Sequence, residues 1–164
     1  IVKQEIIKWK KKLKILIVRS RYNDTISLFR SANKRLIKKK IYSDEILVNG
    51  AFEIPVVIAR NIKKYDGCVA IGIIIKGKTP NFNFISKAIT KGLIDLSILY
   101  KKPIGNAVLT CFNLNQSKKR YHKGEEAVDA ILDVLRTDEK KWVLKHLNQI
   151  IVQGLKLFKN YIAI

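Results

Sequence analysis

The sequence predicts an α/β protein: a three-layer α/β/α domain built on a four-stranded parallel sheet. Two observations support this fold class. Four short apolar runs, typical of buried strands, alternate with stretches whose apolar residues recur at helical spacing. A strand followed by a helix and another strand favours parallel pairing with a right-handed crossover. No internal repeat or Gly/Ser-rich linker interrupts this order, and 164 residues suffice for one domain with a full core.

The first half of the chain contains two predicted strand–helix pairs. Residues 13–18 have the composition of a buried strand, and a helix is expected to begin at Asp24 or Thr25, both good N-cap residues. The second strand is predicted at residues 45–48. Pro55 then suits the first helical position, where the absence of an N–H group does no harm.

The second half continues the same order. Residues 67–75 form a β-branched third strand, residues 82–100 a long helix, and residues 104–109 the fourth strand. A last helix is predicted at residues 125–135, since Ala127, Ile131 and Leu135 fall on one face. The expected organisation is a basic N-terminal arm (1–12), a central domain (13–137) and a C-terminal helical extension (138–164).

Both flanking segments leave two interpretations open. The arm places Val2, Ile6, Ile7 and Trp9 among lysines, as in a basic amphipathic helix for an acidic surface or an arm that packs on a neighbouring subunit. The C-terminal extension has apolar residues at roughly helical spacing. It is either a terminal helix packed on its own domain or a docking element.

The charge of the chain is strongly unbalanced. Lys and Arg number 33 against 13 Asp and Glu, which gives a net charge of +20 and a pI near 10.1. Such an excess favours polyanionic partners, acidic membrane surfaces or phosphorylated ligands. For any single lysine, a solvated surface position is the simpler explanation.

The cysteines and apolar runs bear on the compartment. Cys68 and Cys111 lie in or beside apolar runs and are expected to be buried, reduced thiols, which suits the cytoplasm or an organelle matrix. The longest apolar run, residues 68–75, is far shorter than the roughly 20 residues that span a bilayer, so no transmembrane segment is predicted. The sequence has no Met and begins at Ile1, so we expect the translated start to lie upstream, and targeting is not predicted.

Four short strings, in a fixed order, resemble a known family. They are Arg21-Tyr22-Asn23-Asp24, Gly50-Ala51-Phe52-Glu53-Ile54-Pro55, Lys76-Gly77-Lys78-Thr79-Pro80-Asn81-Phe82 and Pro103-Ile104-Gly105-Asn106-Ala107-Val108-Leu109-Thr110. Together they resemble the lumazine synthases of the riboflavin pathway over about residues 13–135. The resemblance implies a flavodoxin-like strand order. It places the substrate-binding site at the turns that connect the strand ends to the following helices.

The resemblance also implies a reaction and an assembly. Members of that family condense 5-amino-6-(ribitylamino)pyrimidinedione with 3,4-dihydroxy-2-butanone 4-phosphate to form 6,7-dimethyl-8-ribityllumazine. No metal and no organic cofactor is implied, so the expected partners are small-molecule substrates and further copies of the chain. The family forms homopentamers or multiples of them, with sites at subunit interfaces. Holding two reactants in register can supply several kcal/mol of a barrier.

The family pattern assigns substrate-binding residues to the strand ends. Tyr22 offers a flat face to a heterocycle and Asn23 a hydrogen-bonding group; the alternative for Tyr22 is a packing residue at a helix entry. Glu53 would accept hydrogen bonds from hydroxyls, or else is a surface charge. Core packing explains the side chains of Ile73 and Ile75, whose backbone groups remain available to a ligand. The other assigned residues are Ala51, Phe52 and Asn106.

The phosphate of the second substrate requires cations and free N–H groups. Lys78 and Thr79 stand at a predicted helix N-terminus, where the dipole favours an anion. Arg120 matches the family residue that reaches the phosphate from an adjacent subunit, and its guanidinium fork suits that task. Lys123 is the second basic candidate.

The chain departs from the family pattern at three points. Asn81 stands where the family has a proton-transferring His, and an amide cannot donate and retrieve a proton near neutral pH. Since general acid–base catalysis contributes about 10²–10⁴-fold, a slow enzyme or none is expected. His122 is a candidate substitute, or else a solvated surface residue. Only Tyr121 and His122 separate Arg120 from Lys123, a shorter loop than usual. The third departure is the charge.

Two functional hypotheses follow. In the first, which we favour, the protein is a working lumazine synthase, because the phosphate-binding and substrate-binding strings are kept. In the second, it is a catalytically impaired homologue that serves as a basic component of a larger, polyanion- or RNA-containing assembly. Dispersed Lys and Arg suffice for binding to a phosphate backbone. No recognised RNA-reading motif is present in the sequence.

Overall fold

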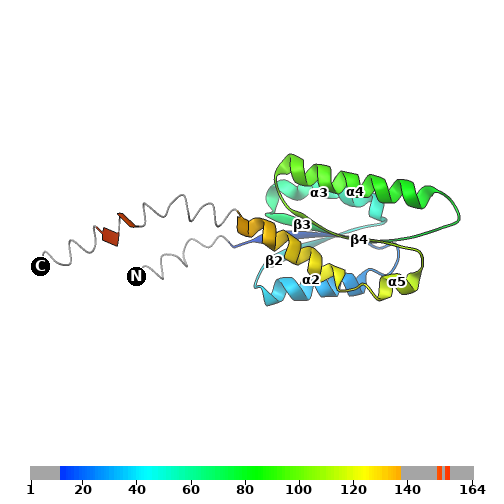
Figure 1. Ribbon diagram of the computed structural model, residues 1–164, viewed down its shortest axis with the longest axis horizontal. Coiled ribbons are helices and arrows are strands. Elements are labelled where there is room, and N and C mark those ends of the chain that lie inside the picture. The colour runs from blue at the N-terminus through cyan, green and yellow to red at the C-terminus, as the bar shows by residue number, and fades with distance from the viewer. Residues whose placement is uncertain (1–11, 138–150, 153, 156–164) are drawn as a thin grey trace, which may run out of the picture. The chain divides into compact units, whose positions relative to one another are not determined.

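Four parallel strands form the centre of the protein. The computed structural model describes residues 12–137, 151–152 and 154–155 (Figure 1). The strands lie in the order β2-β1-β3-β4, with the bounds β1 (Lys14–Ser20), β2 (Tyr42–Val48), β3 (Gly67–Ile75) and β4 (Ile104–Cys111). Most of the predicted arm and C-terminal extension, residues 1–11, 138–150, 153 and 156–164, lie outside the described residues. The proposed domain boundaries therefore stay a prediction.

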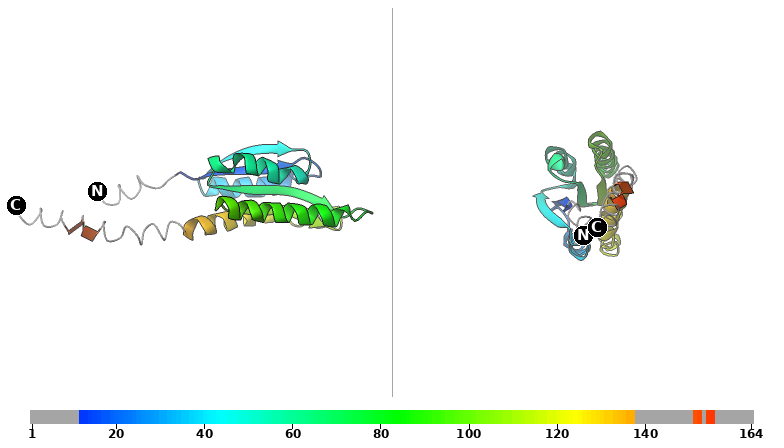
Figure 2. Two further views of the ribbon diagram at one scale, coloured as in Figure 1. Left: turned by 90° about the horizontal axis from the view of Figure 1, so that it is seen from above. Right: turned by 90° about the vertical axis from the view of Figure 1, so that its left-hand side faces the viewer.

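Helices cover both faces of this sheet. Figure 1 shows α3 and α4 on one face and α2 and α5 on the other, and the end-on view in Figure 2 shows the sheet between the two helical layers. The helices are α2 (Ile26–Lys38), α3 (Ile54–Asn61), α4 (Asn81–Tyr100) and α5 (Leu114–Lys118), with helical residues at 123–137. The predicted three-layer α/β/α architecture with a flavodoxin-like strand order is confirmed.

Three short elements were not predicted from the periodicity. The single-turn 3₁₀ helices η1 (Ala51–Glu53) and η2 (Ile62–Lys64) flank α3, and α5 follows β4. Reciprocal capping explains α5: the Asn113 side chain accepts a hydrogen bond from the Gln116 N–H at 3.0 Å, and Gln116 Oε1 accepts one from the Phe112 N–H at 2.8 Å. Such elements depend on side-chain hydrogen bonds, which hydrophobic periodicity does not report.

The hydrophobic core is centred on β1 and β3. Residues 15–18 of β1 and 68–71 of β3 are completely buried, as expected of inner parallel strands with helices on both faces. Against one face pack Ile54 and Ile58 of α3 and Ile89 of α4. Cys68 and Cys111 are both buried and free, and burial raises the pKa of the Cys68 thiol to about 12.

Close backbone contacts fix the start of the helix at residues 123–137. A Cβ added to Gly124 would lie 2.2 Å from the carbonyl oxygen of Leu28 in α2. One added to Gly105 in β4 would lie 2.2 Å from the carbonyl oxygen of Ala127. Arg35 of α2 also binds Asp129 through two hydrogen bonds, of 2.7 and 2.9 Å. This packing sets the position of the turn that precedes the helix, residues 120–123.

Replacement of Gly124 tests this close packing. We expect Gly124→Ala to lower the free energy of unfolding by about 3 kcal/mol, the upper end of typical overpacking penalties, because the new methyl group meets backbone atoms. Urea denaturation of both proteins measures the difference. Gly154→Ala is the matched control, since a Cβ at Gly154 meets nothing within 4 Å. A Gly124→Ala protein as stable as the parent would contradict the tight packing.

A polar cluster lies at the amino ends of β1 and β2. Asp44 accepts hydrogen bonds of 2.7 Å from the hydroxyls of both Tyr42 and Tyr65, and Lys14 Nζ lies 3.0 Å from the same carboxylate. The Lys14 ammonium also lies over both rings, 5.3 and 4.8 Å from their centroids. The Tyr42 hydroxyl, then Tyr65 and Lys14, lower the pKa of Asp44 to about 2. Burial, followed by the Asp44 contact, raises the pKa of Tyr65 to about 12.

The pKa of Asp44 predicts a pH-dependent contribution to stability. A carboxyl group with a lowered folded-state pKa stabilises the fold above its unfolded pKa, near 4, and the contribution is lost as the pH falls through about 2. We therefore expect Asp44→Asn to be less stable than the parent at pH 6, with the difference shrinking between pH 4 and pH 2. Urea midpoints across this range provide the measurement, and Tyr42→Phe should show a smaller effect. A difference independent of pH would show that the Asp44 charge has no role.

Candidate functional site

A pocket opens at the carboxyl ends of the strands, where β1 meets both of its neighbours. The chain crosses from β1 to β2 on one side and then to β3 on the other, and such switch points form ligand crevices in open α/β sheets. The cavity measures about 360 Å³, within the range of small-molecule sites. It is lined by Tyr22, Asn23, Gly50, Ala51, Phe52, Glu53, Ile73, Ile74, Ile75, Gly77, Thr79, Asn81, Phe82 and Ile85.

The segment after β1 contributes Tyr22 and Asn23. Backbone hydrogen bonds of 2.8 Å from the Arg21 and Tyr22 N–H groups to residues 48 and 49 tie this segment to the end of β2. Asn23 adopts the left-handed conformation, with φ of 63°, and its Nδ2 donates to the Ile73 carbonyl at 2.9 Å. The Tyr22 side chain is left 74% exposed at the pocket. The ring is therefore open to a ligand and does not pack in the core.

The turn after β2 is closed by its own carboxylate. Glu53 Oε2 accepts a hydrogen bond of 2.9 Å from the Gly50 N–H, which fixes the single turn of η1. Ala51 is buried beneath this turn, whereas Phe52 is 61% exposed at the pocket. Glu53 is thus held at the pocket wall and is more than a surface charge.

The segment between β3 and α4 contributes the polar end of the pocket. Gly77, Thr79 and Asn81 line the cavity, and Asn81 is the first residue of α4. The first turn of α4 contains no acidic residue and has no side-chain cap. Its N–H groups and the helix dipole therefore favour an anion, and exposed Lys78 lies in the same segment.

The structure does not bring Asn106 to this pocket. Asn106 pairs with Ala70 in the middle of the sheet, whereas the pocket is reached only at Ile73–Ile75 of β3. The Asn106 side chain accepts a hydrogen bond from the Val108 N–H at 2.9 Å. Resemblance to a family sequence motif gives only the position of a residue in the chain. Strand register determines whether that residue lies at the carboxyl end of the sheet.

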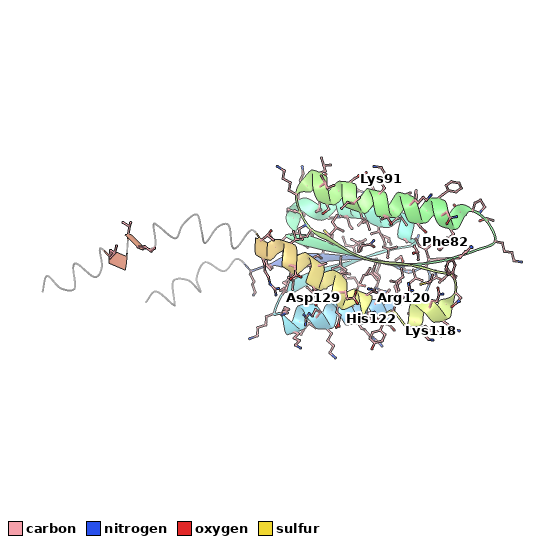
Figure 3. The ribbon with its side chains drawn as sticks, viewed as in Figure 1. Phe82, Lys91, Lys118, Arg120, His122 and Asp129 are labelled. Carbon is pink, nitrogen blue, oxygen red and sulfur yellow. The ribbon has the colours of Figure 1, made fainter. Side chains whose placement is uncertain are left out.

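The basic residues Arg120 and Lys123 also lie apart from the pocket lining, in the turn that follows α5. Phe82 belongs to the first turn of α4 and Arg120 follows α5, and Figure 3 shows the two residues on opposite sides of the sheet. Burial raises the pKa of the Cys111 thiol, and the Arg120 guanidinium partly offsets the increase. Since Cys111 pairs with Ile75 at the end of β3, Arg120 lies near the same carboxyl edge of the sheet. His122 and Lys123 belong to the same turn, and both face Glu126.

Some pocket residues were not assigned from the sequence. Phe82 and Gly77 belong to a matched string, but their types suggest no chemistry on their own. Ile85 follows Asn81 by four residues, one helical turn, so helical spacing could have revealed it. Among the described residues no cluster of three or more His, Cys, Asp or Glu could hold a metal ion. No helix in the described part of the chain is long and apolar enough to cross a membrane.

The fold and the pocket define a flavodoxin-like α/β protein with a pocket at the switch point of its sheet. Comparison with known proteins is more specific. The family model for 6,7-dimethyl-8-ribityllumazine synthase matches residues 12–139. The chain therefore belongs to the 6,7-dimethyl-8-ribityllumazine synthase family, which confirms the resemblance found in the sequence.

Individual relatives agree with the family match. A protein of Aliarcobacter butzleri named 6,7-dimethyl-8-ribityllumazine synthase is 34% identical over 142 residues, covering 79% of this chain and 91% of the relative. The proteins of that name from Cutibacterium acnes and Campylobacter curvus are 32% and 33% identical, over 75% and 76% of this chain and 80% and 87% of their own lengths.

Two substitutions at Asn23 separate its hydrogen bond from its backbone conformation. Asn23→Gly loses the bond to Ile73 but tolerates a positive φ, so we expect a loss of about 1 kcal/mol in the free energy of unfolding. Asn23→Ala also places a Cβ in the left-handed region, which adds about 1–2 kcal/mol. Urea denaturation of the two variants tests this order. Equal effects would show that the conformation of Asn23 is not a constraint.

Proposed function

We propose that the protein acts in riboflavin biosynthesis as a 6,7-dimethyl-8-ribityllumazine synthase, condensing 5-amino-6-(ribitylamino)pyrimidinedione with 3,4-dihydroxy-2-butanone 4-phosphate. One observation carries the proposal. Three of the four family strings, far apart in the sequence, line one pocket through Tyr22, Glu53 and Thr79. Family membership over residues 12–139 supports the same activity.

In this proposal different pocket residues bind the two substrates. The exposed ring of Tyr22 stacks on the pyrimidinedione, with backbone groups at the end of β3 along its edge. Glu53 accepts hydrogen bonds from ribityl hydroxyls, on the wall that it stabilises itself. The uncapped start of α4, with Lys78 and Thr79, receives the phosphate end of the four-carbon substrate.

The proposal includes a homo-oligomer, a pentamer or a multiple of one. Within one chain the pocket is open, because Tyr22 and Phe52 at its edge are 74% and 61% exposed. Arg120 and Lys123, the expected phosphate ligands, are absent from its lining. A second copy that covers the open side would shield the two aromatic rings from water. It would also supply the two cations from its own turn.

The proposed reaction requires no oxidant and no cofactor. The primary amine attacks the ketone and water leaves, which gives an imine. Elimination then releases inorganic phosphate, and the ribitylamino nitrogen closes the ring on the remaining carbonyl with loss of a second water. These steps require orientation, an anion site and proton transfer. Asn81 can orient a substrate by hydrogen bonding, but it cannot carry the proton.

Direct measurement of lumazine formation by the purified protein tests the proposal. We expect turnover above the uncatalysed rate, and Asn81→His should be at least as active as the parent, because an imidazole at the start of α4 can transfer protons. Asn81→Ala is the control, since it removes the amide without adding a titratable group. Parent activity at background with no gain in Asn81→His would overturn the proposal.

A further inference from the structure

The turn between α5 and the helix at residues 123–137 contains Arg120, His122 and Lys123. The Lys123 N–H donates to the Arg120 carbonyl at 3.0 Å, and the Gly124 N–H donates to the Tyr121 carbonyl at 3.1 Å. A turn closed in this way brings its first and fourth Cα atoms within about 7 Å. Arg120 and Lys123 are therefore neighbours in space, and His122 lies between them in the chain.

The imidazole of His122 has a carboxylate beside it. His122 Nε2 lies 3.5 Å from Glu126 Oε1, one helical turn further on. This separation is an ion-pair contact and longer than a good hydrogen bond. The Tyr121 ring meets the imidazole edge-on, with centroids 6.0 Å apart and an interplanar angle of 79°. The side chain of His122 is 45% exposed, so it is oriented on one side and open to a reactant on the other.

Other charged groups lie near His122. Lys123 pairs with the other oxygen of Glu126. From α2, which packs on the same helix, Arg35 binds Asp129, and Ser31 accepts a hydrogen bond from the Glu125 N–H. Among the described residues, Glu126 is thus the acidic group placed against His122.

The chemistry of the elimination step requires a base close to the phosphate. A base removes the proton from C3 of the imine, the electrons of this C–H bond form the C3=C4 double bond, and the C4–O bond breaks to release phosphate. The resulting enol then takes a proton on C4 and becomes a methyl ketone. C4 carries the phosphate and C3 is bonded to C4, so a base close to the phosphate-binding cations can reach both carbons.

We infer that His122 is the proton-transferring residue of the proposed reaction, in place of the imidazole absent at Asn81, and that Glu126 is its positioning residue. The inference rests on the proposed function. His122 takes the C3 proton during elimination and returns it to C4 of the enol. Because the turn is short, His122 stands two residues from Arg120 and accompanies it to the phosphate. Asn81 remains as a neutral hydrogen-bonding group at the start of α4.

Steady-state kinetics of the full chain test the inference. We expect His122→Gln to lower kcat by about 10²-fold with little change in KM, because binding is retained while proton transfer is lost. The parent should also show a pH dependence of kcat that His122→Gln loses. His146→Gln, which removes the other histidine of the chain, is the matched control and should leave both unchanged.

Two further variants keep the test informative if His122→Gln folds poorly. Glu126→Gln removes the carboxylate that orients the imidazole, so kcat should fall by less than in His122→Gln while KM stays unchanged. The double variant Asn81→His/His122→Gln should recover the lost rate. An active parent whose rate and pH profile survive in His122→Gln and Glu126→Gln would overturn the inference and leave the proposed function intact. A parent without turnover would overturn both.

Discussion

Helices cover β1 and β3 on both faces, and the rest of the structure depends on this burial. The central residues of the two strands have no exposed surface, so the sheet can present chemistry only where strands end. At the carboxyl ends the chain turns outward into α2, η1 and α4, and backbone N–H groups and polar side chains emerge together. The pocket is therefore a consequence of strand order and burial before it is a consequence of any particular side chain.

A second constraint is the close approach of backbones in the other helical layer. Gly124 against Leu28 and Gly105 against Ala127 leave no room for a side chain, so the helix that begins at residue 123 has one position on β4 and α2. The Arg35–Asp129 pair adds two hydrogen bonds to the same contact. As a result the turn at residues 120–123 is presented in a fixed place at the carboxyl edge, on the opposite side of the sheet from α4. This separation explains why the cationic turn of a chain does not contribute to the pocket of the same chain.

Sequence reasoning recovered the strands and long helices because their signals are strong. A continuous apolar run rich in β-branched residues, such as residues 67–75, predicts a fully buried strand, and its bounds agree with β3. The short elements escaped because Gln116 and Glu53 stabilise them by hydrogen bonds to backbone groups a few residues away, which leave no periodic pattern. The buried Arg19 was likewise not foreseen. Its charge is accommodated by Glu45 at 2.6 Å and by the ring of Phe29, contacts that exist only after folding.

Site residues that directly follow a strand could be predicted from the sequence. Site residues inside a strand could not, because their position depends on how the strand pairs with its neighbour. Tyr22, Glu53 and Thr79 each follow a strand, so their convergence could be expected from a parallel sheet alone. Asn106 lies inside a strand, and only the pairing with Ala70 shows that it stops short of the carboxyl edge.

The two departures at Asn81 and at the turn between Arg120 and Lys123 are physically compatible with each other. The start of α4 favours an anion, and a protonated imidazole there would oppose the helix dipole, whereas the Asn81 amide is neutral. The short turn, in contrast, holds the imidazole of His122 beside the Glu126 carboxylate. On the proposed function, the start of α4 then receives the phosphate without an imidazole, whereas the turn at residues 120–123 supplies both the cations and the proton-transferring His122.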